Sequence, residues 1–300
     1  MPPAPDQKAL LPPSPVSLLE GLERAGYLAD EEIATACFLA MAMGRPLFCE
    51  GSAGVGKTAL ARAVAEAMGW PLFRLQCYEG LDASEALYAW DFPRQLLHLR
   101  AAETVGAGDR DRLEAELYDR RFLLPRAILK SFEASPSVLL IDEVDRADDE
   151  FEAFLLEALS EFSVTVPELG TITATVPPFV VLTSNRTREV HDALKRRCLY
   201  LWIDHPARDR ELAILRRRFP VLPAGLAEQV IEATRRLRQA DLLKPPGVAE
   251  SLDWLHALHD LQSEALTPTT AALTLGAVLK YQEDQQRVRR DNFKLILGPS

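Results

Sequence analysis

The sequence has few cysteines, no long apolar run and a shortage of positive charge, and each shortage excludes a class of protein. None of its four cysteines lies in a CxxC pair, and a chain of 300 residues does not need disulfide staples. No segment reaches the roughly 18 uninterrupted apolar residues of a membrane-spanning helix. Lysine and arginine number 34 against 44 acidic residues, a formal net charge of −10, which disfavours a broad duplex-DNA interface.

The remaining composition is that of a folded globular protein, with 48% hydrophobic and 26% charged residues. The length predicts about two domains. Residues 1–15 contain six prolines and lack the apolar stretch of a signal peptide, so we expect a flexible tail there. We expect the four cysteines to be buried free thiols, which is typical of a cytoplasmic protein. They are Cys37, Cys49, Cys77 and Cys198.

Short apolar runs separated by helical stretches predict a buried parallel sheet with helices on both faces, which is the α/β class. The expected strands are residues 46–50, 72–77, 138–141, 179–183 and 199–203. After Pro206 only helical patterns follow. We therefore expect an α/β domain over residues 16–205 and a smaller all-helical domain over residues 206–300.

A glycine-rich loop follows the first expected strand and precedes a helical stretch. Residues 51–58, GSAGVGKT, match the pattern G-x-x-x-x-G-K-[ST] in full, in which main-chain N–H groups surround the phosphates of a nucleotide. Lys57 is expected to reach the β- and γ-phosphates and Thr58 to bind Mg²⁺, so ATP and Mg²⁺ are the predicted cofactors. The predicted nucleotide-binding residues are Gly51, Ser52, Ala53, Gly54, Val55, Gly56, Lys57, Thr58 and Ala59.

Polar side chains follow two of the other expected strands. Asp142 and Glu143 come after residues 138–141 and Asn185 after residues 179–183. Ligands bind at the carboxyl ends of strands in open α/β sheets. Asp142 is expected to join Thr58 in holding Mg²⁺, and Glu143 to orient a water toward the γ-phosphate. Asn185 either contacts the γ-phosphate or its attacking water, or forms an ordinary Asn turn.

Acidic residues and β-branched runs between these strand ends predict local structure. Asp145, Asp148 and Asp149 lie where the next helix begins and are expected to cap it or complement its dipole. Two β-branched runs flank a turn between residues 163 and 176 and predict a hairpin.

These strand ends, in this order and followed by a helical domain, resemble the AAA+ ATPases over roughly residues 16–286. The resemblance implies a P-loop NTPase core with a five-stranded parallel sheet in the order 5-1-4-3-2 and a C-terminal helical lid. It also implies a ring, usually a hexamer, with ATP between subunits and Asn185 as γ-phosphate sensor. The stretch at residues 192–198 is similar to the family segment whose arginine reaches the ATP site of the neighbouring subunit and is called the arginine finger. By this similarity Arg197 is the expected finger and Arg196 the second choice.

Longer segments are similar to one branch of the MoxR family, which is linked to maturation of aerobic carbon monoxide dehydrogenase and other molybdenum hydroxylases. They are residues 76–82 (QCYEGLD), 89–97 (AWDFPRQLL) and 244–254 (KPPGVAESLDW). The resemblance implies an ATPase that remodels or matures a metalloenzyme client, alone or with a von Willebrand A-type partner protein. The chain departs from its relatives at Glu250, where many have a nucleotide-contacting arginine.

Three other functions stay open at this level. A small-molecule kinase on a phosphate-loop scaffold would transfer the γ-phosphate to a metabolite. A DNA-remodelling AAA+ motor would show ATPase stimulation by polynucleotide, although the acidic charge balance disfavours nucleic acid as a partner. A scaffold that assembles on ATP would bind the nucleotide tightly without turnover.

Overall fold

The computed structural model describes residues 10–105, 113 and 116–298. Most of the proline-rich segment at residues 1–15, namely residues 1–9, lies outside the described residues. The described chain forms two compact units. One contains the chain before Gly26 together with residues 30–50 and 61–201, and the other contains residues 26–29, 51–60 and 202 onward. The expected domain boundary at residues 205 and 206 stays a prediction.

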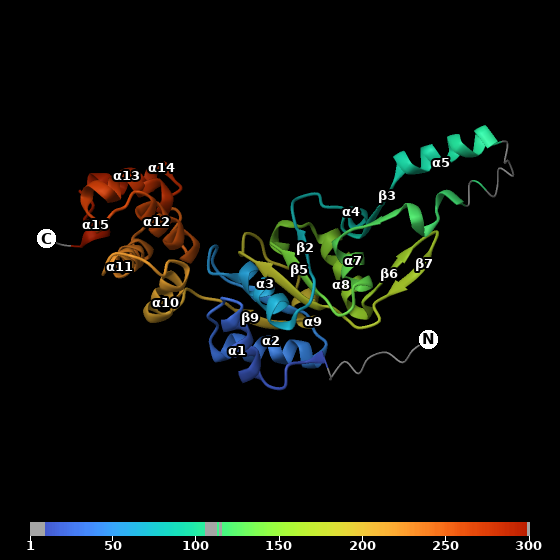
Figure 1. Ribbon diagram of the computed structural model, residues 1–300, viewed down its shortest axis with the longest axis horizontal. Helices are drawn as coiled ribbons and strands as arrows, with labels where there is room; N and C mark the ends of the chain where they lie inside the picture. The colour runs from blue at the N-terminus through green and yellow to red at the C-terminus, as the bar shows by residue number, and fades with distance from the viewer. Residues whose placement is uncertain (1–9, 106–112, 114–115, 299–300) are drawn as a thin grey trace. The chain divides into compact units, whose positions relative to one another are not determined.

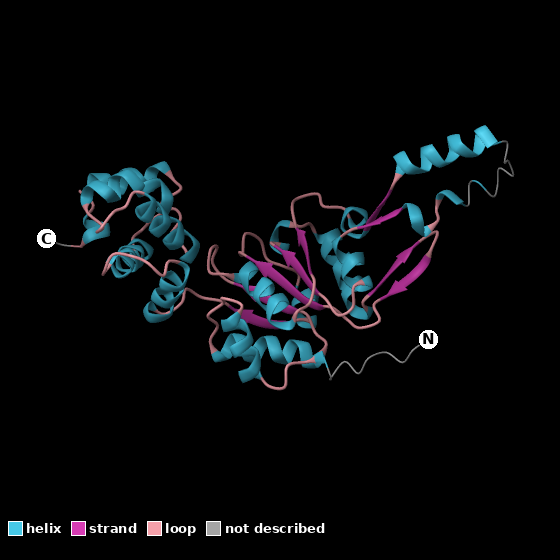
Figure 2. Cartoon of the chain, viewed as in Figure 1, coloured by secondary structure: helices cyan, strands magenta, loops and turns pink. Residues whose placement is uncertain are grey.

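The first unit is built on a five-stranded sheet in the order β2-β5-β8-β1-β9. Figure 2 draws the strands in magenta and the helices around them in cyan. Counted in chain order, these strands run 2-3-4-1-5, which confirms the order expected for an AAA+ core. Neighbours pair in parallel, β2 with β5, β5 with β8 and β8 with β1. The strands are β1 (Leu47–Glu50), β2 (Leu72–Gln76), β5 (Val138–Asp142), β8 (Phe179–Ser184) and β9 (Leu199–Trp202).

Helices cover this sheet because its central strands are apolar on both sides, and every residue of β5 and β8 is buried. Leu139 and Ile141 of β5 share a core with Ile128 of α7 and with Phe151 and Leu155 of α8. Asp148 caps α8 by accepting a hydrogen bond from the Phe151 N–H group at 2.9 Å, as expected from the sequence. The flanking helices are α1 (Pro15–Arg24), α2 (Glu31–Met43), α3 (Lys57–Met68), α7 (Ala127–Glu133), α8 (Asp149–Glu161) and α9 (Asp192–Arg197).

Two smaller antiparallel sheets belong to the same unit (Figure 1). Strands β6 (Ser163–Val166) and β7 (Gly170–Thr173) pair as a hairpin, which confirms the hairpin expected from the sequence. Strands β3 (Tyr88–Trp90) and β4 (Leu123–Pro125) pair in an insert that follows β2. The insert also contains α4 (Ala83–Leu87), α5 (Phe92–Val105) and the short helix η2 (Arg120–Phe122).

The second unit consists mainly of helices with their own apolar core. At its centre, Trp254 is fully buried and its Nε1 donates to Thr274 Oγ1 at 2.7 Å. The buried carboxylate of Glu211 is neutralised by Arg238, which donates from both terminal nitrogens at 2.7 and 2.8 Å. The helices are α10 (Arg208–Arg218), α11 (Leu226–Gln239), α12 (Val248–Asp260), α13 (Pro268–Val278), α14 (Gln282–Arg290) and α15 (Lys294–Leu297). No helix in the described part of the chain has the length and apolar character needed to cross a membrane.

Candidate active site

The glycine-rich loop leaves the end of β1 and leads into α3, whose first residues are Lys57, Thr58 and Ala59. Its backbone requires glycine at Gly51, where φ is +157° and a Cβ atom would lie 2.1 Å from the carbonyl oxygen of Ile203. Gly54 also has positive φ, +77°. The tight curl that the motif predicts is therefore present in the main chain.

The side chain of Lys57 lies inside the loop. It is only 5% exposed, and its Nζ donates to the carbonyl oxygens of Gly51 and Ser52, both at 2.7 Å. An ammonium group buried at the start of a helix and surrounded by loop backbone is placed to meet an anion, because charge and helix dipole act in the same direction.

The same loop contacts the start of α12 within the second unit. The N–H groups of Val248 and Ala249 donate to the Gly54 carbonyl oxygen at 3.1 and 3.2 Å. Glu250 turns back toward its own helix and accepts a hydrogen bond from the Gly247 N–H group at 2.8 Å. The carboxylate at the position where the resemblance implies an arginine thus caps α12.

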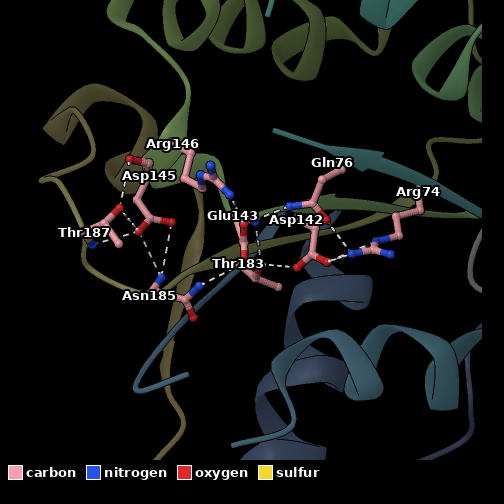
Figure 3. A network of polar contacts seen from close by, with 9 residues as sticks. All are labelled: Arg74, Gln76, Asp142, Glu143, Asp145, Arg146, Thr183, Asn185 and Thr187. Atoms are coloured by element: carbon pink, nitrogen blue, oxygen red, sulfur yellow. Dashed lines mark hydrogen bonds and ion pairs between the residues drawn. The ribbon is translucent and has the colours of Figure 1, made fainter. Parts of the chain in front are cut away.

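Asp142 ends β5 with a side chain that is 4% exposed. Its Oδ2 accepts from Arg74 Nε at 3.0 Å and from Arg74 Nη2 at 2.6 Å, and its Oδ1 accepts from Thr183 Oγ1 at 2.6 Å (Figure 3). Arg74 lies on β2 and Thr183 on β8, so both neighbouring strands hold this carboxylate. A buried carboxylate that already binds a cationic group has the right chemistry for a metal ion.

Glu143 lies just beyond β5 in a left-handed backbone conformation, with φ +56°. Its N–H group donates to Thr183 Oγ1 at 2.9 Å. Its carboxylate accepts from Gln76 Nε2 at 3.0 Å, Arg146 Nη1 at 3.2 Å and Asn185 Nδ2 at 3.3 Å (Figure 3). Strained backbone at a residue held by side chains of several elements is typical of functional positions.

Asn185 is positioned by Asp145, which is 2% exposed. The Asn185 N–H group lies 3.2 Å from both carboxylate oxygens, and Thr187 donates to the same carboxylate from its N–H at 2.8 Å and its hydroxyl at 2.7 Å. Asp145 does not cap the following helix, which was one of the two roles expected for it, because Asp148 is the cap. The Asp145 carboxylate instead holds the chain that leaves β8, about 40 positions away in the sequence.

Sequence reasoning missed Arg74, Gln76 and Thr183, because each looks like an ordinary strand residue. A weak signal was available in β2, where Arg74 and Gln76 are polar, two apart and therefore on one face of the strand. Their partners could not be read from the chain, since Asp142 lies 68 positions after Arg74.

A buried thiol lies next to this network. Burial, and then the nearby carboxylates led by Asp142, raise the pKa of Cys77 to about 12. The Cys77 N–H group donates to the Asp142 carbonyl oxygen at 2.9 Å. This thiol stays protonated and chemically inert at neutral pH.

The two candidate arginines occupy the end of α9 and differ in their surroundings. Arg197 is exposed, but its Nη1 donates to the Leu156 carbonyl oxygen of the same chain at 2.8 Å. Among the described residues, the exposed side chain of Arg196 makes no hydrogen bond or ion pair. Arg45 bonds the backbone carbonyls of both, which anchors the segment.

A parallel sheet in this order, with a phosphate loop after β1 and an acidic pair at the end of β5, defines an ATPase of the AAA+ class. More specifically, residues 46–198 match the AAA domain of the dynein-related subfamily. The match spans just over half of the chain, which therefore belongs to this family and is an ATP-binding ATPase.

Similar proteins include two uncharacterized staphylococcal proteins. SSP1341 of Staphylococcus saprophyticus is 21% identical over 86% of this chain and 92% of its own length. SH1500 of Staphylococcus haemolyticus is 21% identical over 86% of this chain and 93% of its own length. Similar solved structures include a mutant of Thermotoga maritima RuvB, with 14% identity, a TM-score of 0.47 and coverage of 91% of this chain and 72% of that one. A protein of Cytophaga hutchinsonii designated an ATPase also has 14% identity and a TM-score of 0.47, covering 98% of this chain and 96% of that one.

Proposed function

We propose that this ATPase uses Mg²⁺-dependent hydrolysis of ATP to remodel or mature a client protein. Thr183 links Asp142 to Glu143, and Asn185 and Gln76 each donate directly to Glu143 (Figure 3). This network carries the hydrolysis part of the proposal. It brings together, at the carboxyl ends of neighbouring strands, the buried carboxylate of Asp142, which suits a metal ion, the carboxylate of Glu143 and the amide of Asn185. That combination suits phosphoryl transfer to water.

Each residue has a distinct role in this proposal. The main-chain N–H groups of residues 51–58 and the ammonium of Lys57 bind the phosphates of ATP. Thr58 and Asp142 hold Mg²⁺, which would neutralise charge on the β- and γ-phosphates. The carboxylate of Glu143 orients the attacking water and accepts its proton. Asn185 donates to Glu143 in the present structure, and its amide is available to exchange that partner for the γ-phosphate.

The remodelling part of the proposal is supported by the resemblance to the MoxR family at residues 76–82, 89–97 and 244–254. By that resemblance the working form is a ring, usually a hexamer, in which Arg197 or Arg196 reaches the neighbouring site. The client is then a metalloenzyme of the molybdenum hydroxylase class, with a von Willebrand A-type protein as a further partner. A cytoplasmic location stays a prediction.

Substitution of Glu143 tests the hydrolysis mechanism. We expect Glu143→Gln to bind ATP with wild-type affinity in calorimetry, while the steady-state ATPase rate falls by about 10²–10⁴-fold because the water loses its base. Glu150→Gln is the matched control, since Glu150 is exposed on the adjoining helix α8. Unchanged turnover in Glu143→Gln would remove this residue from the mechanism.

The Glu143→Gln variant also serves to identify the client. Held in its ATP-bound form, it is expected to co-purify a molybdenum hydroxylase subunit when ATP is present and to release it when ATP is withdrawn. Capture that does not depend on nucleotide would contradict the remodelling proposal. Appearance of the labelled γ-phosphate on a metabolite, rather than as inorganic phosphate, would identify a kinase.

A further inference from the structure

Arg74 makes a contact that the reaction scheme above does not use. It lies on β2, the edge strand of the sheet, two residues before Gln76 and on the same face. Its guanidinium binds the Asp142 oxygen Oδ2 through both Nε and Nη2 (Figure 3). A positively charged group therefore occupies the carboxylate to which we assign the metal ion.

We propose that Arg74 is a displaceable counter-cation, which neutralises Asp142 until Mg²⁺ arrives with the nucleotide and takes its place. The inference rests on the proposed role of Asp142 as a metal ligand. It makes Arg74 a positioning residue that sets how readily the metal binds.

The exposure of the two partners supports this exchange. The side chain of Asp142 is 4% exposed, whereas that of Arg74 is 44% exposed. A buried carboxylate without a cation is costly, so Asp142 requires a positive partner in either state. Arg74 can move into water at little cost, because its long side chain starts from an edge strand and is already partly solvated.

The same arginine also reaches Glu143 through Gln76. Arg74 Nη2 donates to the Gln76 oxygen Oε1, and Gln76 Nε2 in turn donates to Glu143 Oε2 at 3.0 Å. The guanidinium thus determines which end of the Gln76 amide faces Glu143. When Arg74 leaves, this constraint on the amide is lost, and Glu143 becomes freer at the moment the metal is in place.

The proposal predicts that removing the arginine strengthens metal binding. We would titrate the full-length chain, saturated with a non-hydrolysable ATP analogue, with Mn²⁺ and measure free Mn²⁺ by electron paramagnetic resonance. Arg74→Gln should lower the Mn²⁺ dissociation constant about fivefold, the effect of losing one partly exposed competing charge. Arg74→Lys, which keeps the charge but has a single donor group, should lie between Arg74→Gln and the wild type, and it replaces Arg74→Gln if that variant does not fold.

Two further variants separate the possible failures. Arg126→Gln removes an exposed arginine of the same unit and should leave Mn²⁺ binding unchanged. Asp142→Asn should weaken Mn²⁺ binding strongly, and if it does not, the proposed metal site itself is wrong. If Asp142→Asn weakens binding while Arg74→Gln leaves it unchanged or weaker, the metal site stands and the competition by Arg74 is refuted.

Discussion

Glu143 shows how much a single side chain depends on residues from other elements. Its place after an apolar strand is evident in the sequence, but its orientation comes from Gln76, Arg146 and Asn185 together with a left-handed backbone. These donors set the direction in which the carboxylate points before it orients a water. The side chains that create this order lie on β2, after β5 and after β8.

The cysteines allow a prediction at the residue scale. All four are free and buried, which confirms the expectation from the sequence. Burial raises the pKa of Cys37, Cys77 and Cys198 to about 12, because a thiolate is poorly solvated inside the protein. At pH 8 only about one molecule in ten thousand would carry a thiolate at such a site.

We therefore expect iodoacetamide at pH 8 to leave the folded protein unmodified and to alkylate all four cysteines in guanidinium chloride. Mass spectrometry of intact protein measures both outcomes. Rapid labelling of Cys77 in the folded state would show that its surroundings are open to solvent.

At the scale of elements, the phosphate loop is shaped by contacts that its own motif does not specify. Gly51 packs against the carbonyl of Ile203, just after β9, and Gly54 accepts hydrogen bonds from the start of α12. The glycines needed for the curl are visible in the sequence, whereas these neighbours follow about 150 to 200 residues later. The loop is thus fixed from outside as well as by its own glycines.

Substitution of Gly51 tests this constraint. A Cβ atom at Gly51 would lie 2.1 Å from the Ile203 oxygen, so Gly51→Ala must displace the loop. We expect ATP affinity to fall about 100-fold, about the effect of losing one or two hydrogen bonds to a charged phosphate. Gly225→Ala is the control, because Gly225 has φ +81° and open space around it, so this variant should retain affinity by calorimetry. If Gly51→Ala binds ATP with wild-type affinity, the close approach of Gly51 to the Ile203 oxygen does not constrain the loop.

At the scale of the whole molecule, the phosphate loop groups with the helical unit and the acidic network with the sheet. Motion of such units is the usual way in which nucleotide binding produces mechanical work. A chain built of two compact units fits the remodelling activity that we propose.

Subunit mixing tests whether a neighbouring protomer completes the site. In the ring that we propose, Lys57→Ala and the variant of the required arginine, Arg196→Ala or Arg197→Ala, should each be nearly inactive. Mixing the inactive arginine variant with Lys57→Ala subunits should restore part of the ATPase activity, because some interfaces then combine an intact loop with an intact arginine. An arginine that reaches a neighbouring ATP site in this way raises the hydrolysis rate by a factor of about 10³–10⁵.

The surroundings of the two arginines indicate what to expect from this experiment. Arg197 is bound to Leu156 of its own chain, whereas the Arg196 side chain has no such partner among the described residues, so loss of Arg196 tests the more accessible group. Full activity in both arginine variants, or no recovery in any mixed ring, would exclude a trans-acting arginine at this segment.

Some features of this protein follow from local sequence alone. Apolar runs, glycine spacing and helix signals each depend on neighbours within a few positions, so they predicted the strands, the hairpin between residues 163 and 176 and the phosphate loop. The strand order was implied by the family resemblance instead. The acidic pair was predicted for the same reason, since Asp142 and Glu143 follow directly on a buried strand.

The partners of those residues were decided only by the tertiary structure. Three hydrogen-bonded pairs join segments that lie 40 to 68 positions apart in the sequence. They are Arg74 with Asp142, Gln76 with Glu143, and Asn185 with Asp145. Strand pairing brings such segments together, and the side chain that then fills a given direction depends on register and backbone angle rather than on local pattern. The sequence by itself determined which chemical groups the strand ends carry, and packing of the sheet decided which of them meet.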